Sequence, residues 1–180
     1  MKIALIGYRG SGKSTIGKQL SLALNIPFLD TDHLVESKAG MSIPEIFSRE
    51  GESGFRLRET IALQEALCIP NVVIATGGGI VTRSENRLLL RKADLIVYLT
   101  APAKILIERT QGDAHRPALT TLSHEKEVLT LLQQRIPLYE ELADITIDTS
   151  QYSIEGAVQT ILQQISRQEK EVPCKNSLSC

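Results

Sequence analysis

Several residue classes that would point to other functions are scarce in this chain. Aromatic residues make up 4% of its 180 residues and Trp is absent, which argues against a surface that stacks single-stranded nucleic acid. The formal net charge is -1, so the chain lacks the basic surface that a nucleic-acid partner requires. Any site for an anion must therefore be local.

Cysteines and long apolar runs are scarce as well. Cys68, Cys174 and Cys180 are odd in number and lack metal-ligand spacing, so neither a disulfide framework nor a structural zinc site is expected. The N-terminal apolar run, residues 3–6, is too short for a secretory signal, and no later run reaches the length of a membrane span. We expect a cytoplasmic protein without a membrane partner, and its small size favours a monomer.

The chain alternates short apolar runs with amphipathic segments, which predicts an α/β fold: a three-layer α/β/α sandwich around a five-stranded parallel sheet. Residues 31–67 are mostly helical in pattern, with breaks at Gly40 and Gly51 and a helix cap at Ser42. Residues 1–166 form one domain, and the polar residues 167–180 form a flexible tail. Strands are expected at 3–6, 27–29, 72–75, 95–99 and 145–147, and the other helices at 13–24, 84–92, 102–110, 125–142 and 153–166.

The segment from Gly7 to Ser14 fits the phosphate-loop pattern GxxxxGK[ST], between a predicted strand and a predicted helix. Glycines let successive backbone N–H groups point into one concavity, and the helix N-terminus adds positive charge there. Lys13 can reach the β- and γ-phosphates of a nucleotide, and the Ser14 hydroxyl can bind Mg²⁺. The predicted ATP-binding residues of this loop are Gly10, Ser11, Gly12, Lys13, Ser14 and Thr15. A guanine-binding NKxD motif is absent from the sequence, so a GTPase is not expected.

Two acidic residues, Asp30 and Asp32, follow the second predicted strand, where ligands of open α/β sheets bind. One could assist Mg²⁺ binding, and the other could act as general base toward a hydroxyl. The simpler interpretation of either residue is a helix cap. A second glycine run, Gly77 to Gly79, follows a buried strand, which indicates close approach of a ligand.

Four arginines are candidates for binding anions. Arg56 and Glu59 share a helix face, and their spacing alone favours an exposed ion pair of little energetic value. In the alternative, Glu59 holds Arg56 for a bidentate grip on a carboxylate. Residues 111–123 are polar and lack periodicity, which favours a lid that carries Arg116 to the transferred phosphoryl group. Arg109 and Arg135 flank this lid; for each arginine the simpler interpretation is a surface cation.

Together these segments resemble the shikimate kinase family, within the nucleoside-monophosphate-kinase-like group. The resemblance covers about residues 2–166. It is carried in order by GYRGSGKST, FLDTDHLVE, GESGFRLRE, ATGGGIV, the pair ERT…RPAL, and RIPLYEELAD. It implies the P-loop NTPase fold with strand order 2-3-1-4-5 and transfer of the ATP γ-phosphoryl group to the 3-hydroxyl of shikimate, with Mg²⁺, in aromatic amino-acid biosynthesis through chorismate.

The resemblance also assigns residues. On the donor side it implies Lys13 and Arg116 as catalytic groups, Arg109 against adenine, and Ser14 and Asp30 near Mg²⁺. On the acceptor side, within a substrate-binding segment 31–60 and beyond it, it implies Asp32 as the candidate base, Arg56 and Arg135 on the carboxylate, Glu59 as the orienting partner of Arg56, and backbone contacts from Gly77, Gly78 and Gly79.

Two departures from the family pattern stand out. Ala118 follows Arg116-Pro117 where leucine is usual, and residues 149–152 lack a proline that commonly contacts adenine. Two other functions remain open. A different small-molecule kinase would keep the phosphate loop and lid but would not need Arg56, the glycine run and Arg135. A nucleotide-binding module without catalysis predicts loss of Lys13, Asp32 or Arg116, and all three are present.

Overall fold

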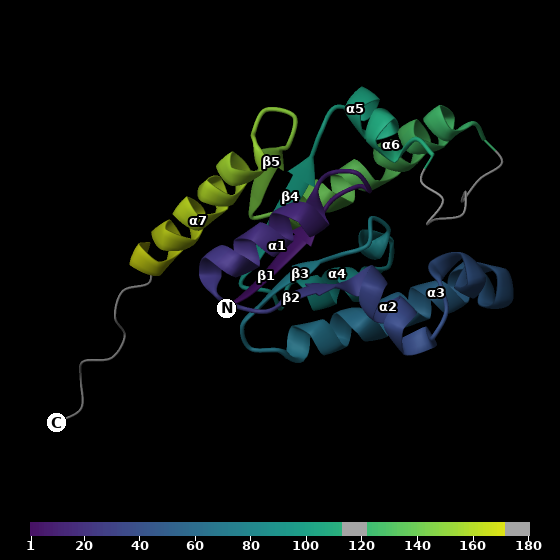
Figure 1. Cartoon of the computed structure of the whole chain (residues 1–180), viewed down its shortest axis with the longest axis horizontal. Helices are drawn as coiled ribbons and strands as arrows, with labels where there is room; N and C mark the ends of the chain where they lie inside the picture. The colour runs from purple at the N-terminus through teal and green to yellow at the C-terminus, as the bar shows by residue number, and fades with distance from the viewer. Residues whose placement is uncertain (113–121, 172–180) are drawn as a thin grey trace.

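The computed structural model describes residues 1–112 and 122–171, and it contains a five-stranded parallel sheet with strand order β2-β3-β1-β4-β5. The order and the all-parallel pairing confirm the expected fold class. The central strand β1 lies between β3 and β4, so the loops that follow these strands open at one edge of the sheet (Figure 1). The strands are β1 (Lys2–Ile6), β2 (Phe28–Asp30), β3 (Val72–Ala75), β4 (Leu95–Thr100) and β5 (Ile145–Asp148).

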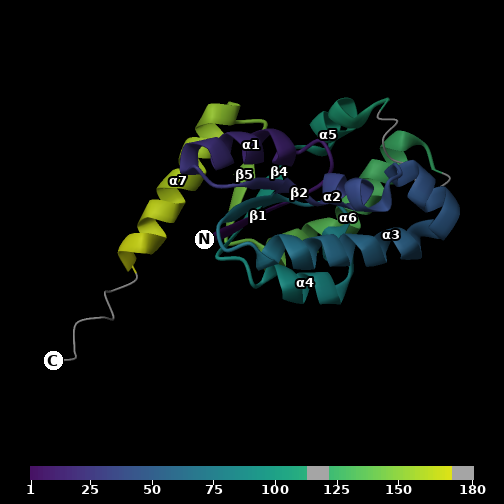
Figure 2. The same cartoon turned by 60° about the horizontal axis from the view of Figure 1, so that its bottom comes forward.

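Helices cover both faces of the sheet because alternate residues of each central strand point to opposite sides. Ile3 and Leu5 of β1 pack toward α1 (Lys13–Leu24) and α7 (Ile154–Glu171). Ala4 and Ile6 pack on the other face. Figure 2 shows the two helical layers on opposite sides of the sheet. The helices of the second layer are α3 (Ile43–Cys68), α4 (Ser84–Leu90) and α6 (His124–Leu142).

The segment predicted to bind the substrate, residues 31–60, contains α2 (Thr31–Ala39) and the first half of α3, and it has a small core of its own. Helix α2 ends at Gly40, whose φ of 63° lies in the left-handed region that glycine favours. Ser42 caps α3. The Glu45 carboxylate accepts hydrogen bonds from the Ser42 backbone N–H and from the Ser42 hydroxyl. The expected break at Gly51 is a kink within α3, with φ 70° and ψ -176°.

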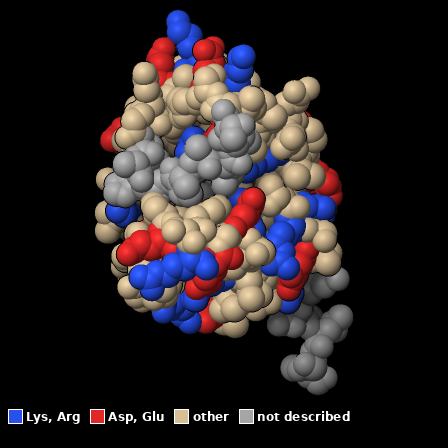
Figure 3. Space-filling view, turned by 90° about the vertical axis from the view of Figure 1, so that its right-hand side faces the viewer, with Lys and Arg blue, Asp and Glu red and all other residues tan. Residues whose placement is uncertain are grey.

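Some helix boundaries differ from those expected. Helix α4 ends at Leu90 rather than residue 92, and a 3-10 turn at Ile80–Thr82 (η1) was not anticipated. Helix α7 continues to Glu171, five residues beyond the expected end, because Arg, Gln, Glu and Lys favour helix even without an apolar stripe. None of the helices in the described part of the chain is long and apolar enough to cross a membrane. On the face shown in Figure 3, basic and acidic side chains are interspersed.

Candidate active site

The phosphate loop connects β1 to α1, as the sequence predicts. Gly12 adopts φ 91° at the cap of α1, a left-handed conformation that lets the loop turn directly into the helix. The Lys13 ammonium donates to the Tyr8 carbonyl at 2.7 Å and lies 3.4 Å from the Ser11 hydroxyl, so the lysine is held within the loop. The N-terminus of α1 and the lysine together place positive charge at this edge of the sheet.

An open cavity of about 930 Å³ lies over this loop. Arg116 and Ala118 fall outside the described residues. Ser11, Arg56, Gly77, Gly79 and Arg135 do not line the cavity itself. Its walls do contain nine of the predicted site residues: Gly10, Gly12, Lys13, Ser14, Thr15, Asp30, Asp32, Gly78 and Arg109.

Asp30 and Asp32 both line this cavity. The Ser14 hydroxyl donates to Asp30 Oδ2 at 2.6 Å, so the two residues predicted near Mg²⁺ are in direct contact. Asp30 also caps α2 by accepting from the Asp32 N–H at 3.0 Å. The capping interpretation and the proximity to Ser14 therefore both hold for Asp30, whereas Asp32 is the next lining residue of the cavity along α2.

The second glycine loop packs directly against the phosphate loop. A Cβ atom on Gly78 would lie 3.1 Å from the backbone nitrogen of Arg9, closer than side chains normally approach. The Gly77 N–H donates to the buried hydroxyl of Thr31 at 3.1 Å, which ties the loop to the start of α2. The two loops are therefore fixed side by side at the ends of neighbouring strands.

Arg56 and Glu59 form a buried ion pair, which contradicts the exposed pair that their spacing alone favours. Arg56 Nη1 lies 2.8 Å from Glu59 Oε2, and the exposed fractions of the two side chains are 8% and 0%. The pair is buried because α3 packs beside the glycine loop, where a Cβ on Gly79 would lie 2.3 Å from Arg56 Nη1.

The electrostatics of this pair follow from its burial. Burial raises the pKa of Glu59, and the Arg56 guanidinium opposes that rise. Burial also works against the charge on Arg56, but the carboxylates of Glu59 and Glu52 outweigh it and raise the pKa of Arg56. Both groups are therefore held in place by each other's charge.

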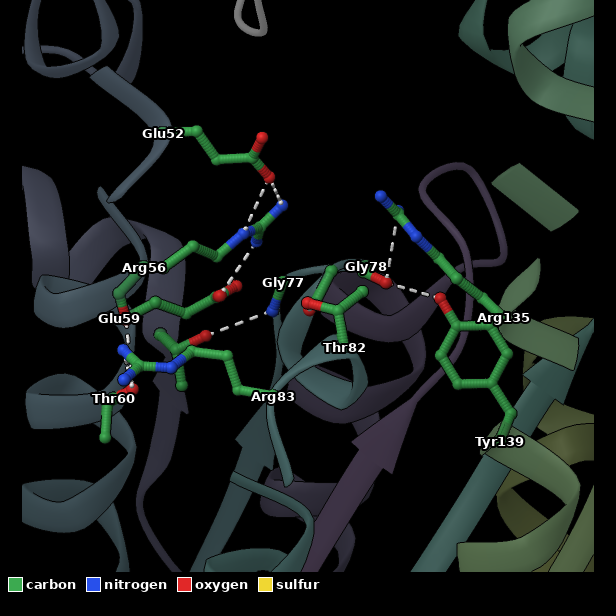
Figure 4. Close-up of polar contacts among 12 residues, drawn as sticks. Glu52, Arg56, Glu59, Thr60, Gly77, Gly78, Thr82, Arg83, Arg135 and Tyr139 are labelled. Carbon is green, nitrogen blue, oxygen red and sulfur yellow. Dashed lines mark hydrogen bonds and ion pairs between the residues drawn. The ribbon is translucent and has the colours of Figure 1, made fainter. Parts of the chain in front are cut away.

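Arg135 and Tyr139 approach the glycine loop from the opposite side. Arg135 Nη1 donates to the Gly78 carbonyl at 3.4 Å, and the Tyr139 hydroxyl donates to the same carbonyl in a short hydrogen bond. Tyr139 is fully buried and stacks on Tyr98 of β4, with ring centroids 5.0 Å apart. In Figure 4 the guanidinium groups of Arg56 and Arg135 point toward each other across this loop.

Arg109, on α5 (Ala103–Thr110), is positioned at the nucleotide side of the cavity. Its guanidinium donates to the Gly10 carbonyl at 3.2 Å and to the Thr149 hydroxyl at 3.1 Å. Tyr152 and Ile154 line the cavity beside it, and 48% and 40% of their surfaces are exposed. These two apolar surfaces lie next to the turn that lacks the family's proline.

Three residues near the site were missed by sequence reasoning. Glu52 accepts from Arg56, and the i, i+4 spacing on one helix was the available signal. Tyr139 stands one turn after Arg135, so the same spacing indicated it. Arg9 lines the cavity and pairs with the buried Glu127 at 3.6 Å, a contact between distant segments that no local pattern predicts.

A parallel sheet with a phosphate loop after its central strand, facing carboxylates and paired arginines, defines a P-loop phosphotransferase acting on a small anionic acceptor. The family model described as shikimate kinase matches residues 9–166. The chain belongs to the shikimate kinase family. The match to this family confirms the predicted class of enzyme, a kinase, and the predicted function, that of a shikimate kinase.

Individual relatives agree with this assignment. The shikimate kinase of Thioalkalivibrio sulfidiphilus is 47% identical over 159 residues, which cover 88% of this chain and 84% of that protein. That of Neisseria gonorrhoeae is 42% identical over 166 residues, covering 92% and 96%. The solved structure of the Acinetobacter baumannii shikimate kinase in complex with shikimate superimposes with a TM-score of 0.88, at 42% identity and 93% coverage of each chain.

Proposed function

We propose that this protein transfers the γ-phosphoryl group of ATP to the 3-hydroxyl of shikimate, with the acceptor's carboxylate held between Arg56 and Arg135. The observation that carries the proposal is the arrangement of these guanidinium groups on opposite sides of the Gly78 loop, which itself packs against the phosphate loop. A small cyclic acid bound there has its ring beside Asp32 and its hydroxyls toward the nucleotide. An acceptor without a carboxylate would form no ionic contact with either guanidinium.

The donor side follows from the cavity over the phosphate loop. Lys13 and the N-terminus of α1 bind the phosphates, and Arg109 packs on the adenine ring. Ser14 and Asp30 fit Mg²⁺, because their hard oxygens lie together in this cavity. The described residues contain no group of three or more His, Cys, Asp or Glu side chains that could hold a metal, so Ser14 and Asp30 are the residues that would hold Mg²⁺ with ATP. Bound Mg²⁺ neutralises phosphate charge.

In the reaction, Asp32 accepts the proton of the 3-hydroxyl as the acceptor oxygen bonds to the γ-phosphorus and the bond to ADP breaks. Phosphoryl transfer requires mainly alignment of the two reactants and neutralisation of charge, since the protein itself performs little covalent chemistry. The loops after β1 and β3 provide the alignment. Lys13 and Arg116 neutralise the charge on the transferred group.

Tyr139 is the positioning residue for the glycine loop in this proposal. We expect Tyr139→Phe to raise KM for shikimate about threefold to tenfold, the effect of losing one buried hydrogen bond, with KM for ATP unchanged. The reason is that the Gly78 carbonyl loses one of its two donors, so only the longer hydrogen bond from Arg135 orients it. Steady-state kinetics with each substrate varied in turn would measure the split.

Tyr98→Phe is the matched control for this change. It removes a phenol hydroxyl from the stacked partner ring, which bonds Thr100 and not the loop. Thermal unfolding of both variants separates lost stability from lost positioning. Equal changes in KM for shikimate in the two variants would contradict the role given to Tyr139.

A coupled assay of ADP release tests the proposed function. With Mg²⁺-ATP we expect strong release only when shikimate is present, and shikimate 3-phosphate as the product by NMR. Release with another polyol acid or a nucleotide, but not with shikimate, would overturn the acceptor assignment and leave the kinase scaffold. Lack of release with any acceptor, despite measurable ATP binding, would favour a nucleotide-binding module without catalysis.

We also propose a cytoplasmic monomer. The reactants expected here are cytosolic metabolites, and cysteines without ligand or pairing pattern suit a reducing compartment. The small size of the 180-residue chain favours a monomer. Light scattering of the purified protein would test the monomer, and a mass of two chains would refute it.

A further inference from the structure

The outer edge of the Arg56 guanidinium is already occupied by a carboxylate of the protein itself. Glu52 Oε1 accepts from Arg56 Nε at 3.1 Å and from Nη2 at 3.0 Å. The remaining nitrogen, Nη1, is directed to the buried Glu59. Figure 4 shows Glu52 and Glu59 on opposite sides of the Arg56 guanidinium. The Nε and Nη2 edge is the one on which a planar carboxylate binds best.

The two carboxylates on Arg56 differ in how firmly they are held. The Glu59 side chain is 0% exposed, whereas that of Glu52 is 56% exposed. Exposed ion pairs contribute little because water screens them and ordering the side chain costs entropy. Removing the buried partner, Glu59, would instead leave a buried charge without its counter-ion. Glu59 is therefore the permanent anchor, and Glu52 is the contact that can exchange.

The contact geometry favours exchange with a better ligand. Glu52 uses a single oxygen for both donors, whereas a free carboxylate can offer one oxygen to each nitrogen in two parallel bonds. Glu52 directly follows the kink at Gly51, and 56% of its side chain is exposed. A rotation of this exposed side chain toward solvent frees the edge without disturbing the helix.

We propose that Glu52 holds the place of the acceptor's carboxylate on Arg56 and is displaced when the acceptor binds. This inference rests on the proposed function, because it requires Arg56 to bind the carboxylate. Glu52 keeps the buried guanidinium ordered before the acceptor arrives, and it lowers the apparent affinity by the fraction of molecules in which it occupies the edge. Acceptors that bind without using the Nε and Nη2 edge of Arg56 do not compete with Glu52.

The test measures shikimate binding to the full chain by isothermal titration calorimetry. Glu52→Gln removes the competing charge and keeps the side-chain shape, and we expect it to lower Kd for shikimate about twofold to fivefold, in line with the strength of an exposed ion pair. Glu50→Gln is the control, because Glu50 also accepts two hydrogen bonds from an arginine of α3, Arg58, with one oxygen for each nitrogen at 2.8 Å, away from the acceptor site. The Kd of the Glu50→Gln variant for shikimate should equal that of the wild type.

The possible outcomes separate this inference from the proposed function. Tighter binding in Glu52→Gln alone supports the inference, and unchanged or weaker binding overturns it, since Glu52 would then support Arg56 in the bound state. Arg56→Lys, measured alongside, should weaken binding. If it does so while Glu52→Gln changes nothing, the proposed function stands and the inference fails. If Arg56→Lys leaves Kd unchanged, both fail.

Discussion

Replacing Asp32 with asparagine is expected to lower the rate of phosphoryl transfer about 10²- to 10⁴-fold, the range typical of a lost general base. The substitution keeps the size of the side chain and its position after the Asp30 cap, so α2 should remain folded. ATP binding should be retained, because the phosphates are bound by the loop and Lys13. Single-turnover transfer to shikimate and titration of ATP binding would measure the two quantities separately.

Glu155→Gln provides the control for this loss. Glu155 lies on α7 and also faces the cavity, but from the nucleotide side formed with Thr149 and Tyr152. The Glu155→Gln substitution therefore removes a negative charge from the same cavity without changing a contact to the acceptor. Near-normal turnover by Asp32→Asn would show that this residue only positions the hydroxyl or does not contact it, and the base assignment would be wrong.

Arg56→Ala is expected to cost about 2 to 4 kcal/mol in acceptor binding, or about 30- to 700-fold in Kd, because a buried charged donor of the carboxylate is lost. The affinity for ATP should change little. Arg58→Ala is the matched control, since Arg58 is the next arginine on α3 and pairs with Glu50 at the surface. An Arg56→Ala protein that binds shikimate normally would contradict the assignment of this carboxylate site.

The same substitution should also reduce stability, because it leaves Glu59 buried without its cation, at a cost of about 3 to 5 kcal/mol. Burial already raises the pKa of Glu59 above its ordinary 4.5, and loss of Arg56 removes the main opposing influence. The native state then holds a proton that the unfolded chain releases, so the free energy of unfolding should fall as pH rises above 4.5.

The double variant Arg56→Ala/Glu59→Gln separates this effect from the loss of binding. Glutamine does not ionise, so the fall in stability with rising pH should disappear, while weak shikimate binding remains. Denaturant unfolding at several pH values would measure the free energy. The same pH slope in the single and double variants would show that Glu59 is not its source.

Much of the fold and of the donor side could be predicted from sequence because the signals are local. The phosphate loop is one continuous motif, and Asp30 and Asp32 are located by the strand β2, whose last residue is Asp30. The five strands are short apolar runs between turn residues, and their parallel pairing follows from the intervening helices. The exact ends of α4 and α7 were not predicted correctly, because polar residues that favour helix carry no periodic signal.

The acceptor side depends on contacts that spacing does not encode. The burial of Arg56 and Glu59 arises where α3 meets the glycine loop, and Arg135 reaches the Gly78 carbonyl across 57 positions of sequence. Spacing alone therefore favoured a surface ion pair, and only the resemblance to a family suggested the opposite. Glu52 was within reach of local reasoning, since it stands one helical turn before Arg56.

The separate small core of the α2–α3 segment has a consequence for how such a chain can diverge. Phe55 and Ile46 pack within this segment, whereas Leu63 and Ala66, farther along α3, belong to the core under the sheet. Mutations at distant sites without shared partners have nearly additive effects on stability. Substitutions around Phe55 and Ile46 can therefore change the packing beneath Arg56 with little effect on the stability of the core under the sheet.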